Sequence, residues 1–171
     1  MKQAVIGLGS NLGDSGENLK KAIEALAALP HTKVLRCSSL YRTPPVEVED
    51  EQPDYLNQCV LLETELSPRA LLGSCLGIEA AMGRRRVRWH GARCLDLDLL
   101  LYEGEEMDTE ELHLPRPGIL NRAFVLVPLE ELCPCKRFFT FSFEKAYNTI
   151  DKTDIHMVKS FVNQGETRKK C

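Results

Sequence analysis

The order in which strand-like and helix-like apolar patterns follow one another between residues 4 and 102 leaves few folds open. Short apolar runs bounded by turn residues are typical of strands, and apolar residues at spacings of three and four are typical of helices. The order here is strand, helix, strand, strand, helix, strand. It predicts an α+β protein with a ferredoxin-like β-α-β-β-α-β sandwich, whose two helices lie on one face of the sheet. The predicted strands are residues 4–8, 34–41, 55–66 and 94–102.

Both predicted helices carry residues that favour a helix start and a helix end. Asp14 or Ser15 can cap the first helix, and Pro30 ends it. A Ser-Pro pair at residues 67–68 favours the start of the second helix, and Gly83 can end it in the left-handed conformation. The expected buried residues are Leu19, Ala22, Ile23, Leu26 and Leu29 in the first helix and Leu71, Cys75, Ile78 and Met82 in the second.

The length of 171 residues suits a single domain. We assign residues 1–134 to this domain, including a short predicted helix at about residues 123–132. Residues 135–171 form a C-terminal extension without clear patterns, which we expect to pack on the same domain.

Composition excludes several classes of protein. Hydrophobic residues make up 43% of the chain and charged residues 27%, as in a folded globular protein rather than a disordered one. The formal net charge of −3 gives no overall attraction to nucleic acid, and no apolar run approaches the ~18 residues of a membrane span. Seven cysteines, an odd number, would leave one unpaired in an oxidising compartment. We therefore expect a cytoplasmic monomer without a nucleic-acid or membrane partner.

The most specific local pattern is the alternation of two aspartates with leucines at residues 95–101. On a strand, Asp96 and Asp98 share one face and lie roughly 6.5–7 Å apart along the chain. Such a pair of carboxylates suits Mg²⁺, which takes its other ligands from water and phosphates. The alternative is a solvent-exposed strand face with two surface aspartates. The leucines expected on the opposite face are Leu95, Leu97, Leu99 and Leu101.

A run of arginines precedes these carboxylates. Residues 83–93 contain five of the 22 basic residues of the chain. Because guanidinium groups match phosphate oxygens in geometry, arginines beside a carboxylate pair favour a polyphosphate–Mg²⁺ site. Glu79, one turn before Gly83, could reach the same site. The alternative is a solvated loop that pairs with the acidic residues at 47–54 or 103–111.

A second group of residues suits a planar heterocycle. Tyr55 and Asn57 share a strand face, where one offers a flat stacking surface and the other a donor and an acceptor. The rigid segment at residues 43–46 can hold backbone groups in fixed positions beside them. The alternative is an ordinary strand start after a proline-bounded loop.

Over residues 4–134 the chain resembles the 6-hydroxymethyl-7,8-dihydropterin pyrophosphokinase family, because five motifs occur in the order found there. They are Gly9-Ser10-Asn11-Leu12, Ser39-x-Tyr41-Arg42-Thr43-Pro44-Pro45, Gln52-Pro53-x-Tyr55-Leu56-Asn57, Arg93-x-Leu95-Asp96-Leu97-Asp98 and Asn121-Arg122-x-Phe124-Val125-Leu126. The resemblance implies a ferredoxin-like fold. It also implies transfer of pyrophosphate from ATP, the co-substrate, to 6-hydroxymethyl-7,8-dihydropterin in folate biosynthesis, which yields the pterin diphosphate and AMP.

The resemblance also implies a role for individual residues. Two Mg²⁺ ions would be held by Asp96 and Asp98, and the catalytic arginines would be Arg84 and Arg93. The nucleotide would be bound by Glu79, Arg86, Arg93, Arg116 and Arg122, with Arg84 and Arg86 in a loop over the active site. The pterin would be bound by Thr43, Pro44, Val46, Tyr55, Asn57 and Phe124.

The chain departs from the family pattern at two motifs. Family members usually show Trp-Gly-Pro-Arg before the aspartates, whereas this chain has Trp89-His90-Gly91-Ala92-Arg93. Arg116 stands where the family usually has a histidine that faces the nucleotide. An arginine can bind phosphate but cannot both donate and accept as imidazole does.

Two non-catalytic alternatives fit the same order of elements. A nucleic-acid-binding module would use the arginines but needs exposed sheet aromatics, and aromatic residues are only 6% of this chain. The other alternative is a domain that binds a small molecule without catalysis.

Overall fold

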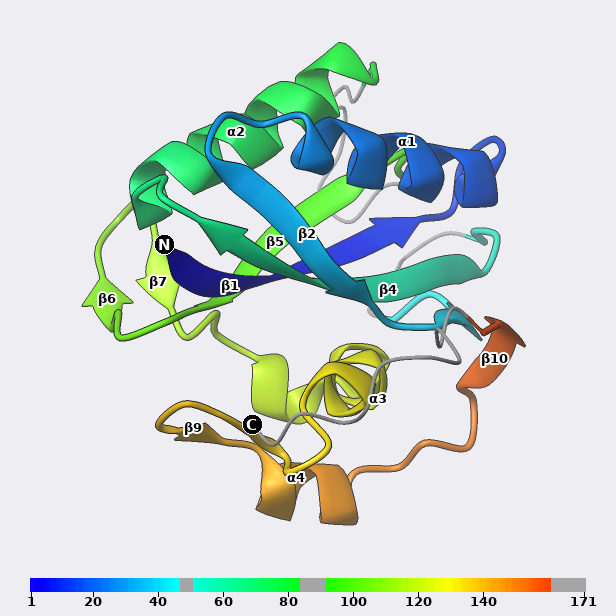
Figure 1. Ribbon diagram of the computed structural model, residues 1–171. Coiled ribbons are helices and arrows are strands. Elements are labelled where there is room, and N and C mark those ends of the chain that lie inside the picture. Colours follow the sequence, from blue (N-terminus) through cyan, green and yellow to red (C-terminus); the bar gives the residue numbers. More distant parts are fainter. Residues whose placement is uncertain (47–50, 84–91, 161–171) are drawn as a thin grey trace.

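The computed structural model describes residues 1–46, 51–83 and 92–160 of the chain. Their main sheet has six strands, in which β1 lies between β4 and the edge strand β5 and is antiparallel to both (Figure 1). Both β2 and β3 pair with β4, and β10 adds to the outer edge of β3. The strands are β1 (Lys2–Ser10), β2 (Thr32–Cys37), β3 (Leu40–Thr43), β4 (Tyr55–Thr64), β5 (Asp96–Tyr102) and β10 (His156–Lys159).

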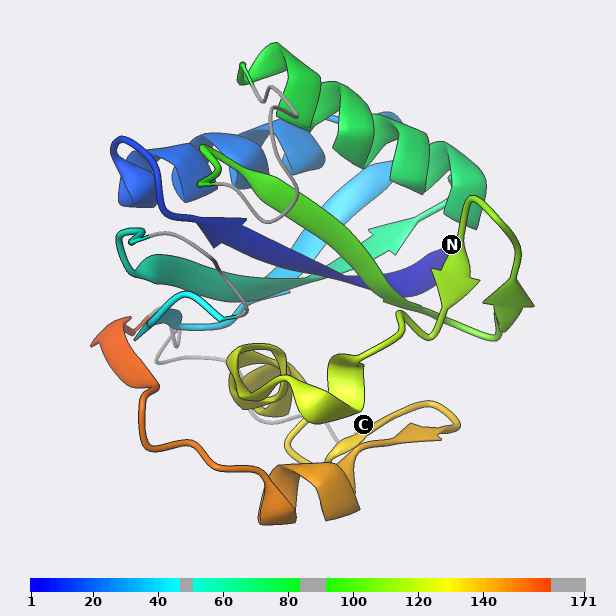
Figure 2. The ribbon, with the colours of Figure 1, turned by 180° about the vertical axis from the view of Figure 1, so that it is seen from behind.

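Helices cover both faces of this sheet. The helices α1 (Ser15–Ala27) and α2 (Pro68–Ala81) lie side by side on one face, as the sequence predicts (Figure 1). The opposite face is covered by α3 (Ala123–Leu132), which follows the short 3-10 helix η1 (Ile119–Asn121), and the view from behind shows the same layers (Figure 2).

The predicted helix ends are confirmed. The Asp14 carboxylate accepts a hydrogen bond from Glu17 N at 3.0 Å, and the Ser67 hydroxyl accepts one from Ala70 N at 3.3 Å. These contacts satisfy backbone donors that a first helical turn leaves unpaired. Gly83 has φ +82° after the end of α2, a conformation that costs glycine little.

Two hydrophobic clusters hold the layers together. One lies between the sheet and α1 and α2, and includes the fully buried Leu19, Leu62 and Leu71. The other lies between the sheet and α3, and includes Leu126 and Leu129. The central strands therefore bury both faces, which explains why their sequences are nearly continuous in apolar residues.

A β-bulge divides β5. Ile6 pairs with Leu99 and Val5 with Leu101, so Leu100 is an extra residue on β5. Side-chain alternation shifts by one residue at such a bulge. Leu95, Leu97 and Leu99 pack toward α1 and α2 as predicted, but the predicted position of Leu101 is wrong, because it packs with Leu100 toward α3.

The predicted strand at residues 34–41 is interrupted in the structure. Ser38 and Ser39 separate β2 from β3 and are fully buried. Ser38 N donates to Cys59 O at 2.8 Å, and Cys59 N donates to the Ser38 hydroxyl at 2.9 Å. This side-chain hydrogen bond replaces a regular ladder contact, and the two strands meet β4 in separate registers.

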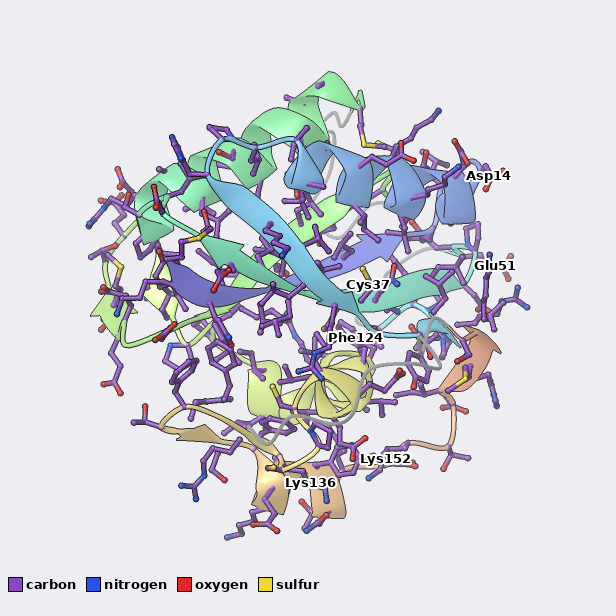
Figure 3. All side chains as sticks on the ribbon, in the orientation of Figure 1. Asp14, Cys37, Glu51, Phe124, Lys136 and Lys152 are labelled. Carbon is purple, nitrogen blue, oxygen red and sulfur yellow. The ribbon has the colours of Figure 1, made fainter. Side chains whose placement is uncertain are left out.

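The chain beyond α3 forms short elements on the same side of the molecule. Phe138 and Phe143 are buried in the cluster that contains Leu126. Lys136 and Lys152, labelled below the sheet in Figure 3, have their ammonium nitrogens 5.2 and 4.6 Å from the Tyr147 ring centroid. These elements are β8 (Arg137–Phe138), β9 (Phe141–Ser142) and α4 (Glu144–Thr149), whereas the short strands β6 (Met107–Asp108) and β7 (His113–Leu114) lie between β5 and η1. Across the described ranges, no helix is long and apolar enough to span a membrane.

Candidate active site

The two predicted metal-binding aspartates lie at the start of β5 and point toward the face that α3 covers. Gly7 of β1 lies opposite Asp98 of β5 on one side and opposite Cys59 of β4 on the other. The Cys59 side chain packs toward α3, and side chains at directly paired positions point to the same face of a sheet, so Asp98 points to that face too. Asp96 occupies the neighbouring row opposite Gly9. The two side chains are 27% and 32% exposed, so they line an accessible surface rather than the core.

Each aspartate is paired with its own arginine. Arg93 Nη1 lies 2.8 Å from Asp96 Oδ2, and Arg116 Nη2 lies 3.3 Å from Asp98 Oδ1. Burial, followed by the charge of Asp96, raises the pKa of Asp98, and the guanidinium groups of Arg116, Arg122 and Arg93 offset part of this increase. Three of the four predicted nucleotide-binding arginines therefore converge on the carboxylates.

Arg93 is positioned by the turn after β1. Its carbonyl accepts from Asn11 N at 3.0 Å, and its N–H donates to Asn11 Oδ1 at 2.8 Å. The Asn11 amide also donates to Gln52 Oε1 and Pro53 O, both at 3.1 Å. Sequence reasoning quoted Asn11 within a motif but gave it no role, because its partners lie far away along the chain.

Arg116 is positioned by the bulge in β5. Arg116 N donates to the carbonyl of Leu100, the extra residue, at 2.8 Å. The preceding bond, between Leu114 and Pro115, is a cis peptide. The bulge thus fixes the backbone from which the Arg116 side chain reaches Asp98.

Arg122 and Phe124 come from the start of α3. The Arg122 guanidinium carbon lies 5.9 Å from the centre of the Phe124 ring, and Phe124 packs between α3 and the sheet (Figure 3). Gly118 has φ +83°, and a Cβ built there would be 3.4 Å from Arg122 Nε. The turn at Gly118 therefore allows both a left-handed backbone and a close approach of Arg122.

The predicted pterin residues of β3 and β4 lie beside the carboxylates. Asn57 Nδ2 donates to Thr43 Oγ1 at 2.7 Å, and both residues are buried. Gly9 lies between Asn57 on one neighbouring strand and Asp96 on the other. A Cβ at Gly9 would be 3.3 Å from Asn57 Oδ1 and 3.8 Å from Tyr55 Cδ1, so the glycine keeps the sheet surface low between the two groups.

The remaining predicted residues differ in position. Pro44 and Val46 follow β3 and are exposed. Glu79 is buried on α2, and its carboxylate accepts from Leu97 N at 2.7 Å, between the two aspartates. Arg84, Arg86, Trp89 and His90 lie outside the described residues.

The donor set fits magnesium bound together with phosphates. The part of the chain that the structure describes contains no group of three or more His, Cys, Asp or Glu side chains that could hold a metal ion. Two carboxylates on one strand face leave coordination positions for phosphate and water, which is the ligand environment that Mg²⁺ prefers. Cys37, Cys59, Cys75, Cys94 and Cys135 are free thiols.

A family model described as 7,8-dihydro-6-hydroxymethylpterin-pyrophosphokinase (HPPK) matches residues 5–134. The chain belongs to the HPPK family. It is 48% identical over 134 residues to 2-amino-4-hydroxy-6-hydroxymethyldihydropteridine pyrophosphokinase of Methylorubrum extorquens, covering 78% of this chain and 84% of that protein. The match therefore includes the motifs that carry the carboxylates, the arginines and the predicted pterin residues.

Two other HPPK-related proteins match beyond residue 134. The folic acid synthesis protein fol1 of Schizosaccharomyces pombe is 36% identical over 165 residues, which are 95% of this chain and 22% of that protein. The wild-type HPPK-DHPS structure of Plasmodium falciparum superposes with a TM-score of 0.64 at 14% identity, and covers 86% of this chain and 43% of that one. This chain thus spans less than half of either longer protein, and the superposition supports the fold alone.

Proposed function

We infer that the protein transfers pyrophosphate from ATP to 6-hydroxymethyl-7,8-dihydropterin, giving the pterin diphosphate and AMP in folate biosynthesis. Membership of the HPPK family supports this reaction and disfavours the two non-catalytic alternatives. The observation that carries it is the row from Asp96 across Gly9 to Asn57, which sets an anionic, arginine-lined site beside a hydrogen-bonding one.

On this proposal the phosphates bind at the carboxylates. Asp96 and Asp98 would hold Mg²⁺, and two ions are proposed. When bound, Mg²⁺ neutralises charge that develops on the phosphate oxygens. The residues proposed to bind the nucleotide are Glu79, Arg86, Arg93, Arg116 and Arg122.

The pterin would bind on the other side of Gly9. Asn57 and Thr43 would read its edge together with the backbone of Pro44 and Val46. The ring would stack between Tyr55 and Phe124, which approach from β4 and from α3. Such a pocket combines flat apolar faces with a few placed polar groups, as binding sites for planar ligands do.

In the proposed reaction the protein acts mainly by positioning ATP and the pterin relative to each other. The pterin hydroxymethyl group releases its proton to solvent and its oxygen forms a bond to the β-phosphorus of ATP. The bond from that phosphorus to the oxygen shared with the α-phosphate breaks, and AMP leaves with that oxygen. Holding the two substrates in line removes much of the entropic cost of their encounter. Arg93 and Arg84 would stabilise the transferred charge.

We also propose a ferredoxin-like topology for the unit from β1 to β5. The strand order β5-β1-β4-β3 and the placement of α1 and α2 on one face support it. The division at residue 134 stays a prediction.

Release of AMP is the direct test of this function. Purified protein with ATP and Mg²⁺ should form AMP and the pterin diphosphate in equal amounts only when the pterin is present. AMP formation that does not depend on the pterin, or ADP as the nucleotide product, would contradict the proposal. Chelation of Mg²⁺ should stop the reaction.

Replacing Asn57 with alanine should weaken pterin binding by at least about tenfold, or 1.4 kcal/mol, and leave binding of Mg–ATP nearly unchanged. The reason is that Asn57 loses its contacts with the pterin edge but lies across Gly9 from the carboxylates. Calorimetric titration with each ligand measures both affinities. The matched control is Gln58→Ala, because Gln58 is also buried and donates to Ser38 O at 2.7 Å. Equal losses for both ligands would assign Asn57 a structural role.

Replacing Gly9 with alanine should lower kcat/KM by at least about tenfold, since the new methyl group would rise between the two subsites. Its contact with Asn57 Oδ1 at 3.3 Å is close but not prohibitive, so the protein should still fold. Steady-state kinetics and thermal melting separate the two effects. Gly73→Ala on α2 is the control, because a Cβ there meets nothing within 4 Å. Unchanged kinetics in Gly9→Ala would remove Gly9 from the site.

A further inference from the structure

In the structure, each proposed metal ligand forms an ion pair with an arginine. Arg93 and Asp96 are in close contact at 2.8 Å, whereas Arg116 and Asp98 are separated by 3.3 Å. Arg116 Nε is buried and has no hydrogen-bond partner within the described residues. The Arg116 guanidinium therefore uses only part of its donor set on Asp98, and the Arg116–Asp98 ion pair is the weaker of the two.

The two arginines differ in how firmly the rest of the protein holds them. Arg93 is fixed through both backbone groups by Asn11. Arg116 is fixed at its backbone by Leu100 O, but its side chain is 41% exposed and is held at its end by Asp98. Rotation of the Arg116 side chain would break only one long ion pair, and it would allow the unpartnered Nε to form a hydrogen bond.

A guanidinium and a divalent cation compete for the same carboxylate. Mg²⁺ binds oxygen at about 2.0–2.1 Å, so a cation on Asp98 would lie next to the Arg116 charge and be repelled by it. A phosphate group supplies the opposite interaction, because it accepts paired hydrogen bonds from a guanidinium fork that includes Nε. Binding of a metal ion together with a phosphate therefore disfavours the Arg116–Asp98 ion pair and provides a new partner for the Arg116 guanidinium.

We propose that Arg116 exchanges partners, holding Asp98 in the free protein and moving to a phosphate of the nucleotide when metal and ATP bind. This inference rests on the proposed function. Its consequence is that metal and nucleotide bind with positive cooperativity, because each helps to break the pairing that opposes the other. Arg116 is thus a positioning residue whose role depends on its being arginine.

The test is metal binding by calorimetry, with Mn²⁺ as the probe, in the absence and presence of α,β-methylene-ATP. This analogue cannot release AMP, so turnover does not enter the measurement. Wild-type protein should bind Mn²⁺ at least about tenfold more tightly when the analogue is present. In Arg116→Gln, Mn²⁺ alone should bind more tightly than in wild type, and the enhancement by the analogue should fall at least about fivefold.

The increase in Mn²⁺ affinity caused by the analogue distinguishes an exchange of partners by Arg116 from simple charge repulsion between Arg116 and the metal. A static arginine would weaken metal binding equally with and without nucleotide, so its removal would leave the enhancement unchanged, and that result overturns the proposal. Arg116→Lys, which keeps the charge but loses the fork, should lie between the two. Arg69→Ala, at an exposed arginine paired with Glu111, is the control and should behave as wild type.

Failure of the exchange and failure of the proposed function are distinguishable. AMP release by wild-type protein tests the reaction and does not involve these variants. A protein that releases AMP with an enhancement unaffected by Arg116→Gln keeps its function and loses the exchange. Circular dichroism confirms that each variant is folded before titration.

Discussion

Replacing Asp98 with alanine should reduce pyrophosphate transfer by at least about a thousandfold, or roughly 4 kcal/mol of transition-state stabilisation. Asp98 is a proposed metal ligand at the point where Arg93, Arg116 and Arg122 converge. Its loss removes the anchor for the cation and leaves the phosphates beside unbalanced guanidinium groups. Single-turnover measurements of AMP formation at saturating Mg²⁺ and pterin give the rate of transfer.

Asp98→Ala should nevertheless fold normally. The side chain is one-third exposed and burial raises its pKa, so its ionised form stabilises the folded protein little. The melting temperature without ligands should stay within a few degrees of wild type. Asp108→Ala is the control, because Asp108 is exposed and pairs only with His113 among the described residues. Transfer within tenfold of wild type in a folded Asp98→Ala protein would refute the metal assignment.

Replacing Glu131 with alanine should lower the free energy of unfolding by about 2–4 kcal/mol. The Glu131 carboxylate on α3 accepts from Ser39 N and from the Ser39 hydroxyl, both at 3.0 Å, and from the Tyr41 hydroxyl. Ser39 and Tyr41 are buried, so the substitution leaves three donors without an acceptor. Urea unfolding followed by circular dichroism measures the change, and Glu130→Ala on the same helix is the control.

Glu131→Ala should also weaken pterin binding, because α3 carries Phe124 at its other end. The loss for Mg–ATP should be smaller, since Asp96 and Arg93 belong to segments that Glu131 does not contact. A variant with wild-type stability would show that the hydrophobic cluster alone fixes α3 against the sheet.

The parts of the fold that the sequence predicts are those governed by local chemistry. Asp14, Ser67 and Gly83 act on backbone groups within four residues, so their effect is visible in a short window. The position of Asp96 and Asp98 on one face follows from strand alternation, and the structure confirms it. The structure also brings Asn57 and Thr43 together near these aspartates.

The parts that the sequence does not predict depend on distant partners. The break between β2 and β3 arises because Ser38 bonds Cys59 and Ser39 bonds Glu131, and nothing near these serines indicates either contact. The role of Asn11 needs both Arg93 and Gln52 to be in place. The extension escapes prediction because its short elements pack through isolated aromatic residues such as Phe138 and Phe143, without a repeating pattern.

Because of the extra residue in β5, the exact number of residues in that strand matters for the candidate site. Deleting Leu100 would restore simple alternation with Leu101 still opposite Val5 and Tyr102 still opposite Ala4, and would remove the Leu100 side chain from the cluster between the sheet and α3. The same deletion would remove the carbonyl that receives Arg116 N. Loss of this residue would therefore alter both the packing of the sheet against α3 and the direction of the Arg116 side chain. Natural variation in β5 should accordingly exchange one residue for another without changing the number of residues between Asp98 and Arg116.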